Sequence, residues 1–408
     1  MHRLAGFRTL LFAVLGIVIQ QPALTQTYQV IHNFTGAEDG ANPAAGLTAD
    51  NAGNLYGTAN SGPLETGTAF KLRKTNGNWI FTLLYTFEGG SDGSGPVSRM
   101  VFGPDGTLYG ATSRGGTGCL VGCGTVFNLK PTPTICHTAM CAWQETVLYR
   151  FSGGSDGSFP ANGDLVFDRA GSLYGATGEG GIVESGVVYK LAPSRSGWTE
   201  SVVYSFTHGN DGGSPNGVIF GQDGNLYGTA FSGGMYSRGT VFQLVSSGMG
   251  WSENTLHSFQ EDEGFWPSGG LILDGSGGLY GSTTSGGAGG GDVFNLTPVG
   301  GSWNLTVLYG FPNGIGPDAS LTMDAVGNLY GAEQRGGLYG FGVVFKLTPN
   351  IDGMWTYSSM HDFTGIDGAG PLSNVVLDAS GRLYGTTYNG GTYNCNGEGC
   401  GVVWEITQ

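Results

Sequence analysis

Aromatic and aliphatic residues alternate with polar residues along several short segments of the chain. From Trp79 to Phe87 every second residue is aromatic or aliphatic, and from Trp198 to Phe206 only Glu200 interrupts the same alternation. Successive side chains of a β-strand point to opposite faces, so these segments are predicted to be strands with one buried face. The same Trp-to-Phe spacing of eight occurs in six places: Trp79/Phe87, Trp143/Phe151, Trp198/Phe206, Trp251/Phe259, Trp303/Phe311 and Trp355/Phe363. These six tryptophans are predicted to be core residues.

This segment is the last of four in a repeated unit. Segments 160–168, 172–175, 187–191 and 198–206 are rich in β-branched and aromatic residues and are separated by turn residues. They predict four strands, named a, b, c and d in chain order. Strand b carries the triplet Leu-Tyr-Gly, which occurs seven times, at Leu55, Leu108, Leu173, Leu226, Leu279, Leu329 and Leu383. A unit repeated at such intervals predicts similar sheets packed around a ring or along a stack.

The two ends of the chain indicate a ring. Residues 28–34 form a d segment with no a, b or c before it, whereas residues 372–406 form a, b and c segments with no d after them. One sheet is therefore expected to contain both ends, which closes a circle. We predict an all-β fold, a seven-bladed β-propeller with four antiparallel strands per blade.

The repeat has the form D-x-x-G-N-L-Y-G-T-x-x-x-G-G-x-x-x-G-T-V-F-x-L, followed by V-L-Y-x-F and x-D-G-x-x-P; residues 223–244 are a representative stretch. This pattern resembles the GloVer-type tandem repeat of exported bacterial proteins, and the resemblance covers essentially the whole chain after residue 25. It implies an extracellular or surface protein, in a family that often carries varied C-terminal anchors. It implies no known reaction.

Residues 1–25 do not belong to the repeat. Arg3 and Arg8 precede an apolar run from Thr9 to Ile19, followed by small residues, which is typical of a secretory signal peptide; an uncleaved anchor is the alternative. We expect residues 26–408 to be one monomeric domain, secreted, periplasmic or at the cell surface, with no membrane span after signal cleavage. The net charge is −15, and about −17 without the two arginines, so the surface should repel nucleic acid.

Six cysteines form three close pairs, each in a loop longer than its counterparts. In an exported protein such pairs predict disulfides, here Cys119–Cys123, Cys136–Cys141 and Cys395–Cys400. The alternative for the second pair is a metal site that includes His137, but two Cys and one His leave the coordination of zinc incomplete.

An acidic residue recurs before Gly in the loops between strand d and the next strand a. Calcium is the one cofactor that this pattern suggests, with candidate ligands Asp39, Asp92, Asp156, Asp211 and Asp367. Asp-Gly is also ordinary turn chemistry, in which the carboxylate accepts hydrogen bonds from nearby backbone N–H groups. Recurrence in blade after blade favours the turn interpretation.

The d–a and b–c loops are expected on one rim, because strands alternate in direction. They differ most among the copies, and a specific site has to come from residues that break the repeat. Aromatic residues among amides on these loops predict a surface for a carbohydrate or protein ligand: Asn60, Phe159, Phe231, Phe265, Trp266, Gln334, Tyr339, Tyr388 and Asn389. The alternative is that some of these aromatics fold back and cover the rim.

Catalytic motifs are absent from the sequence: it contains no nucleophile elbow, paired-histidine motif or phosphate-binding loop. The leading interpretation is an exported, non-catalytic binding or interaction propeller. The first alternative is a propeller enzyme, a lyase or hydrolase with residues from several blades near the axis; its weak candidates are Glu179, Glu333, Arg114, Arg335 and His208. The second is a purely structural surface component.

Overall fold

The computed structural model describes residues 26–132, 143–160, 163–248, 250–312 and 315–408. The predicted signal peptide (1–25) and the predicted Cys136–Cys141 disulfide, with His137, lie outside the described residues.

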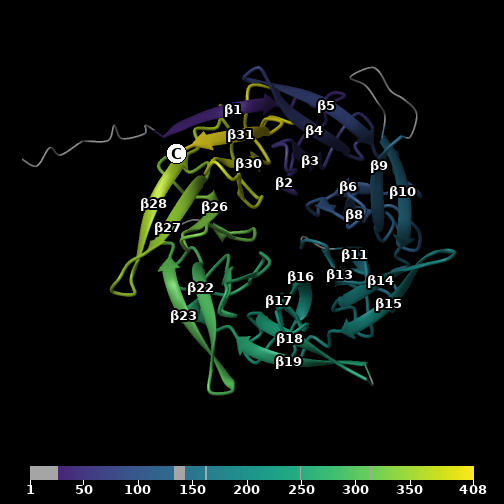
Figure 1. Ribbon diagram of the computed structural model, residues 1–408, viewed down its shortest axis with the longest axis vertical. Coiled ribbons are helices and arrows are strands. Elements are labelled where there is room, and N and C mark those ends of the chain that lie inside the picture. The colour runs from purple at the N-terminus through teal and green to yellow at the C-terminus, as the bar shows by residue number, and fades with distance from the viewer. Residues whose placement is uncertain (1–25, 133–142, 161–162, 249, 313–314) are drawn as a thin grey trace, which may run out of the picture.

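Seven antiparallel sheets surround a central axis (Figure 1), so the predicted seven-bladed propeller is confirmed. Each blade has strands a to d from the axis outward, and strand a is split in blades 2, 3 and 6. Blade 1 contains β2 (Leu47–Ala49), β3 (Leu55–Ala59), β4 (Thr68–Thr75) and β5 (Asn78–Thr86), and blade 2 contains β6 (Ser94–Pro96), β7 (Val101–Phe102), β8 (Leu108–Arg114), β9 (Thr125–Pro131) and β10 (Trp143–Arg150). Blade 3 contains β11 (Ser158–Pro160), β12 (Val166–Phe167), β13 (Leu173–Glu179), β14 (Val187–Ser194) and β15 (Gly197–Ser205), and blade 4 contains β16 (Gly213–Phe220), β17 (Leu226–Ser232), β18 (Thr240–Ser247) and β19 (Gly250–Ser258).

The remaining blades follow the same order. Blade 5 contains β20 (Ile272–Leu273), β21 (Leu279–Ser282), β22 (Asp292–Val299) and β23 (Ser302–Gly310), and blade 6 contains β24 (Ile315–Pro317), β25 (Thr322–Met323), β26 (Leu329–Arg335), β27 (Val343–Pro349) and β28 (Trp355–Asp362). Blade 7 contains β29 (Val376–Leu377), β30 (Leu383–Thr387), β31 (Val402–Thr407) and β1 (Thr27–Asn33). A 3-10 turn at Glu261–Glu263 is the one helical element among the described residues, where no helix is long and apolar enough to cross a membrane.

Both ends of the chain build blade 7. Strand β1 pairs antiparallel with β31, from Thr27 opposite Thr407 to Asn33 opposite Val402. The first strand therefore lies beside the last (Figure 1), and backbone hydrogen bonds close the ring as the sequence predicted.

Each residue of the Leu-Tyr-Gly triplet has a structural role. The seven leucines are all buried. The glycines let an aromatic residue of strand c cross close over strand b: at Gly228 an added Cβ would collide with the ring of Phe242, and the other six glycines face an aromatic ring in the same way. A side chain there would force the two strands apart, so the position requires Gly.

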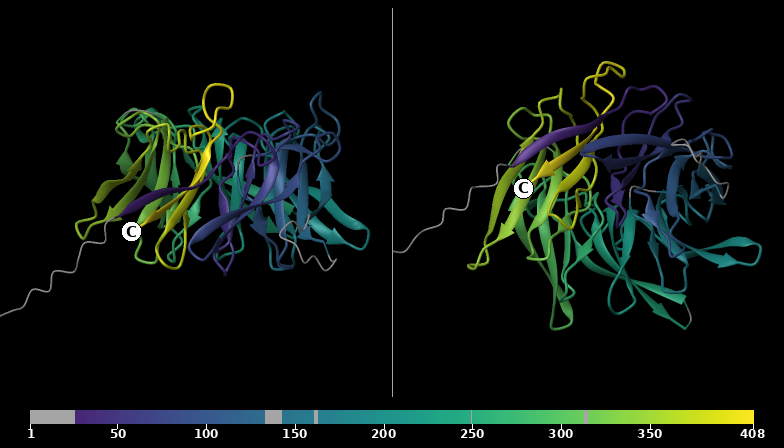
Figure 2. Two further views of the ribbon diagram at one scale, coloured as in Figure 1. Left: turned by 90° about the horizontal axis from the view of Figure 1, so that it is seen from above. Right: turned by 45° about the horizontal axis from the view of Figure 1, so that its top comes forward.

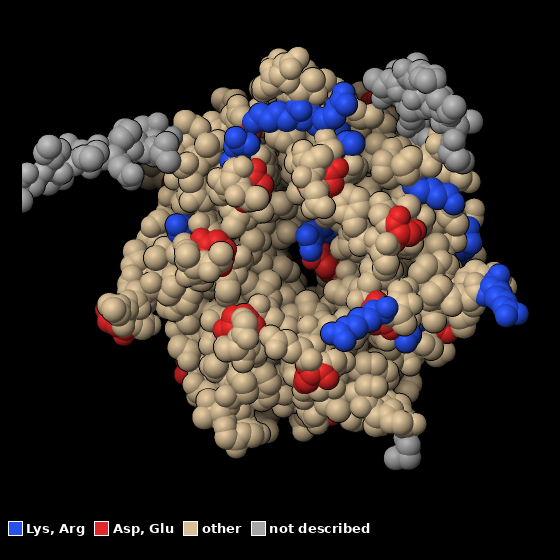
Figure 3. All heavy atoms as spheres, in the orientation of Figure 1, with Lys and Arg blue, Asp and Glu red and all other residues tan. Residues whose placement is uncertain are grey.

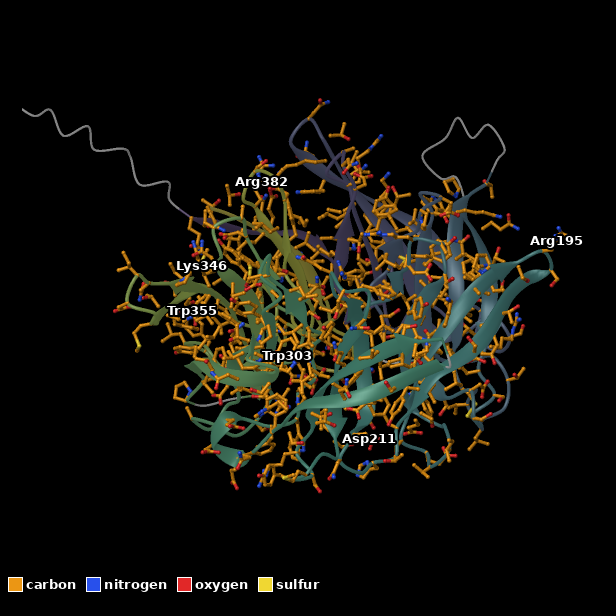
Figure 4. The ribbon with its side chains drawn as sticks, turned by 60° about the horizontal axis from the view of Figure 1, so that its bottom comes forward. Arg195, Asp211, Trp303, Lys346, Trp355 and Arg382 are labelled. Atoms are coloured by element: carbon orange, nitrogen blue, oxygen red, sulfur yellow. A yellow bond between two sulfur atoms is a disulfide. The ribbon has the colours of Figure 1, made fainter. Side chains whose placement is uncertain are left out.

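The tyrosine of the triplet ties strand b to the a–b turn and to the next blade. All seven tyrosine hydroxyls donate to the aspartate of their own a–b turn, as in Tyr227 to Asp223 (2.8 Å). The ring of Tyr227 also meets Trp303 of blade 5 edge-on, with centroids 6.0 Å apart. Figure 4 shows Trp303 and Trp355 on the outer strands. Each of these two tryptophans packs against residues of the preceding blade.

The two ends of the ring differ in composition. The a–b and c–d turns form one end, called the turn rim, and the d–a and b–c loops form the other, called the variable rim; Figure 2 shows the ring from the side with loops at both ends. The turn rim repeats one Asp-containing turn in every blade, whereas the loops of the variable rim differ from blade to blade. A specific binding site is therefore to be sought on the variable rim or along the axis.

Candidate functional site

Backbone hydrogen bonds hold the loops of the variable rim together. Isolated bridges join d–a to b–c loops within blades, as between Phe265 and Ser285. The residue before the first proline of each blade also donates its N–H to the preceding blade's b–c loop, as Trp266 does to the carbonyl of Arg238 (2.9 Å). The variable rim is therefore a linked surface that can hold side chains from neighbouring blades in fixed positions.

Exposed apolar side chains concentrate on this rim. They occur in the b–c loops or at the end of strand b in every blade except blade 5, with two more in d–a loops. These residues are Leu64, Leu120, Val121, Ile182, Val183, Phe231, Met235, Tyr236, Trp266, Leu338, Tyr339, Phe341, Ile366 and Tyr393. Clusters of exposed apolar residues among polar ones mark interaction surfaces more often than isolated ones do.

Two predicted aromatic residues form a pair between blades 4 and 5. Phe231 is the second-last residue of strand β17, and Trp266 lies in the next d–a loop; their rings are stacked with centroids 5.8 Å apart at 17°. Phe265 meets Trp266 edge-on at 4.8 Å. Trp266 is 41% exposed and Phe231 37%, so the pair remains open to a ligand. We call Phe231 and Trp266 the aromatic platform.

The backbone at Trp266 adopts a conformation that bulky residues avoid. Its φ is 58°, in the left-handed region, and Phe159 at the same position of blade 3 has a φ of 55°. The equivalent residues with positive φ in four other blades are Asn42, Gly95, Ser214 and Gly370. Small residues and Asn tolerate this conformation, whereas a bulky side chain there is strained, and such strain clusters at functional sites.

Polar groups border the aromatic platform. The Ser232 hydroxyl lies 3.4 Å from Nδ1 of His208, a residue predicted as a weak catalytic candidate. The Arg238 guanidinium lies 4.4 Å from the centre of the Phe265 ring and donates to Glu261 (2.9 Å). The sequence did not single out Arg238; its position before the last glycine of the b–c loop was the only available signal.

The other predicted rim residues lie apart from the platform. Tyr388 and Asn389 belong to blade 7. The carbonyl of Tyr388 accepts a hydrogen bond from the side chain of Asn42 in blade 1 (2.9 Å), and the side chain of Asn389 donates to Glu398 (3.0 Å). Phe159 and Glu179 line a separate cavity of about 250 Å³. Asn60 donates its N–H to the carbonyl of Asn42. Gln334 and the exposed Tyr339 belong to blade 6, on another part of the rim.

The weak catalytic candidates are distributed over four blades. Arg114 and Glu179 are exposed ends of strand b in blades 2 and 3, and His208 lies beside Ser232 at the border of the platform. In blade 6, Arg335 is exposed, whereas Glu333 is buried and burial, together with Asp362, raises its pKa to about 8. In the described part of the chain, no hydrogen bond or ion pair joins any two of these five residues.

The d–a aspartates are occupied by their own turns. Asp211 accepts from the Tyr204 hydroxyl (3.1 Å), from the backbone N–H of Thr207 (2.8 Å) and from the Thr207 hydroxyl (2.6 Å), and Figure 4 shows it in its loop. Asp39, Asp92, Asp156 and Asp367 make similar contacts. Within the described ranges, no three His, Cys, Asp or Glu side chains are grouped to hold a metal. Calcium binding stays a prediction.

Two of the three predicted disulfides are present. Cys119–Cys123 and Cys395–Cys400 close loops of the variable rim in blades 2 and 7, with Cα atoms 5.1 and 4.9 Å apart. The first encloses Leu120, whose side chain is fully exposed. An apolar residue held at the tip of a cross-linked loop is preorganised for contact with a partner.

Comparison with known proteins places this architecture in a family. The model of the Gloeobacter/Verrucomicrobia repeat matches residues 13–218 and 161–400. The chain belongs to the Gloeobacter/Verrucomicrobia repeat family. No curated protein matches the sequence.

Solved structures resemble this family member in fold alone. The extracellular domain described as part of a hybrid two component system of B. thetaiotaomicron is 12% identical over 92% of this chain and 39% of that chain, with a TM-score of 0.55. PorZ, a surface component of the type-IX secretion system of Porphyromonas gingivalis, is 15% identical over 88% of this chain and 46% of that chain, with a TM-score of 0.51. This chain thus spans less than half of either protein. A gluconolactonase from Xanthomonas campestris is 15% identical over 74% of this chain and 81% of that chain. Its TM-score of 0.43 is too low to bear on activity.

Proposed function

We propose that this member of the repeat family is an exported, non-catalytic propeller that binds carbohydrate on the aromatic platform of its variable rim. The observation that carries the proposal is the strained Trp266, which presents an indole at a position where five other blades have Asn, Ser or Gly. A strained backbone persists only where the surrounding structure or the function maintains it.

The platform has the chemistry that a sugar ring requires. The exposed parts of the Phe231 and Trp266 rings offer apolar area to the C–H groups of a pyranose. His208, Ser232 and Arg238 lie around them and can exchange hydrogen bonds with hydroxyl groups. The disulfides, and the extracellular and surface descriptions of two similar folds, support an exported protein.

The test is thermal unfolding of the oxidised protein with a panel of soluble glycans, followed by titration calorimetry of each one that binds. A ligand that binds only the folded state raises the unfolding midpoint by mass action. We expect Trp266→Ala or Phe231→Ala to weaken binding by about tenfold or more, equivalent to about 1.4 kcal/mol. The matched control is Tyr339→Ala, which removes an exposed aromatic from the same rim in blade 6. A glycan whose affinity is unchanged by both platform variants would contradict the proposed site.

A protein ligand is the second candidate, favoured by Leu120 and Val121 in the cross-linked loop of blade 2. Such tips can insert into a pocket of a partner without losing much conformational freedom. The measurement compares proteins cross-linked to the wild type and to a Leu120→Ser, Val121→Ser double variant in the native exported fraction. A partner lost from the variant supports docking through this loop, and identical partners contradict it.

A further inference from the structure

The repeat is also broken along the axis, where one residue of each blade, within or just before its innermost strand segment, faces the centre. This is the residue before the buried apolar residue of strand a: Gly46, Arg99, Asp164, Gly217, Gly270, Ser320 and Asn374. Gly217 and Gly270 leave space beside blades 4 and 5, whereas the neighbouring blades 2 and 3 carry the charged residues Arg99 and Asp164. An axis with only a scaffold role has no need of this asymmetry.

Arg99 and Asp164 form an ion pair across the seam between blades 2 and 3. Nε of Arg99 lies 3.1 and 3.0 Å from the two carboxylate oxygens of Asp164, and a terminal guanidinium nitrogen also contacts Asp164. Both side chains keep somewhat more than a quarter of their surface exposed. Figure 3 shows basic and acidic atoms side by side inside the central opening of the ring.

These residues line a cavity of about 610 Å³, large enough for a small organic molecule. The rest of its wall is mostly aliphatic, with Ile219, Ile272 and Met323 among the lining residues. A second cavity of about 160 Å³ adjoins it, shares Asp164, Ser320 and Asn374, and adds Asp318.

The charges of the two cavities do not balance. Asp164 is paired with Arg99, but among the described residues no cation pairs with Asp318, whose neighbour is the hydroxyl of Ser268. Arg99 is the one basic residue among the described residues that line either cavity. Without a cationic partner, burial raises the pKa of Asp318, and a cation beside it would favour its charged form. The two cavities thus offer two carboxylates to one cation, next to an apolar wall.

We propose that the axial cavity binds a small organic cation, an amine with an aliphatic or aromatic body, separately from the ligand of the rim. The ammonium lies between Asp318 and Asp164 and is the cationic partner that Asp318 lacks. The body lies along the aliphatic wall formed by blades 4 to 6, in the space left open by Gly217 and Gly270. Amphipathic cations gain from both contacts, whereas a neutral or anionic analogue gains from one at most.

The experiment measures binding of methylamine, butylamine, hexylamine and benzylamine to the full mature chain by calorimetry, with hexanol, benzyl alcohol and benzoate as probes of changed charge. We expect the amines to bind, with up to about a fourfold lower Kd for each added methylene that is buried. Asp318→Asn should weaken hexylamine binding by about tenfold or more, while Asp262→Asn, which removes an exposed carboxylate of the rim, should leave it unchanged.

Equal binding of alcohols and amines, amine binding that survives Asp318→Asn, or no amine binding at all would overturn the proposal. Two further variants separate it from the rim and from misfolding. Ile272→Ser should weaken hexylamine but not methylamine, because only the longer body reaches the aliphatic wall. Trp266→Ala should leave amine binding unchanged, so failure of the carbohydrate proposal and failure of this one are distinguishable.

Discussion

Strand β17 connects the two rims and shows how differently they are built. At its start on the turn rim, Leu226, Tyr227 and Gly228 are fixed by the core, by an aspartate and by an overlying aromatic ring, and all seven blades repeat them. At its other end, Phe231 is exposed and stacks on the strained Trp266, and no other blade has this pair. Within one strand, the sequence changes from residues that determine the fold to residues available for binding.

The largest effect should come from Leu226→Ala at the turn-rim end of this strand. Removing a fully buried leucine should lower the free energy of unfolding by about 2–5 kcal/mol, measured by denaturant unfolding. Phe231→Ala, five residues along, should change stability much less and glycan binding much more. If both variants destabilised the protein equally, the contrast within β17 would be lost.

The next effect is a dependence of stability on pH, with opposite signs for two groups of acids. Burial raises the pKa of Asp223, but hydrogen bonds from Tyr227 and from the turn outweigh it, so the pKa is lowered. Five other a–b aspartates behave alike. A lowered pKa contributes stability that is present above the pKa of the unfolded chain and lost as pH falls through the folded value.

Three glutamates on strand d have the opposite shift. Burial and the d–a aspartate of the preceding blade raise the pKa of Glu145 to about 8 and that of Glu200 to about 7, and burial chiefly raises that of Glu253 to about 7. Their stabilising contribution is complete below the pKa of the unfolded chain and is lost as pH rises to about 7–8.

The unfolding midpoint should therefore be highest in mildly acidic solution and fall towards pH 8. Changing Glu145, Glu200 and Glu253 together to Gln removes the groups that titrate while keeping their size. We expect the triple variant to lose a large part of the decline between pH 5 and pH 8, measured by thermal unfolding at fixed ionic strength. The remainder is expected from Glu333 and Asp292, whose pKa values burial also raises. An unchanged decline in this variant would assign the effect to other acids.

A further effect separates the tyrosine contact on the turn rim from its packing. Tyr227→Phe removes the hydroxyl that donates to Asp223 but keeps the ring against Trp303. Hydrogen bonds to charged groups contribute about 1.5–3 kcal/mol when partly buried, and this exposed turn should give the lower value by denaturant unfolding. Glycan and amine binding should not change.

The smallest effect concerns the strained residue of the aromatic platform. Trp266→Gly relieves the strain at φ 58° but removes the ring contacts with Phe231 and Phe265, so the net change in the free energy of unfolding should stay within about 1 kcal/mol. The same variant should lose glycan binding. A variant that is both less stable and still able to bind would show that Trp266 serves packing rather than recognition.

Much of the fold could be predicted from the sequence, because its determinants recur. The Trp-to-Phe spacing and Leu-Tyr-Gly define contacts inside and between neighbouring blades, and each copy supports the others. The β-bulge in strand d could not be predicted: Val203 has no partner opposite it and is buried, although its parity places it on the polar face. Tertiary packing determines such an irregularity, not local alternation.

The sites were less accessible to sequence reasoning. Aromatic residues in variable loops predicted the platform in part, but the positive φ of Trp266 and the approach of Arg238 depend on loop closure. The ion pair between Arg99 and Asp164 joins residues 65 apart, and nothing local marks either one as facing the axis.

Closure of the ring by β1 and β31 has a consequence for how the protein is made. Strand β1 is the first strand of the domain to be synthesised, and its partner β31 is the last. The hydrogen bonds of β1 can therefore form only after the whole chain has been made. A truncated chain that lacks residues 402–408 leaves β1 and β30 with unpaired edges, which invite aggregation. Quality-control proteases can therefore distinguish an interrupted product from a finished one by whether β1 and β30 are paired with β31.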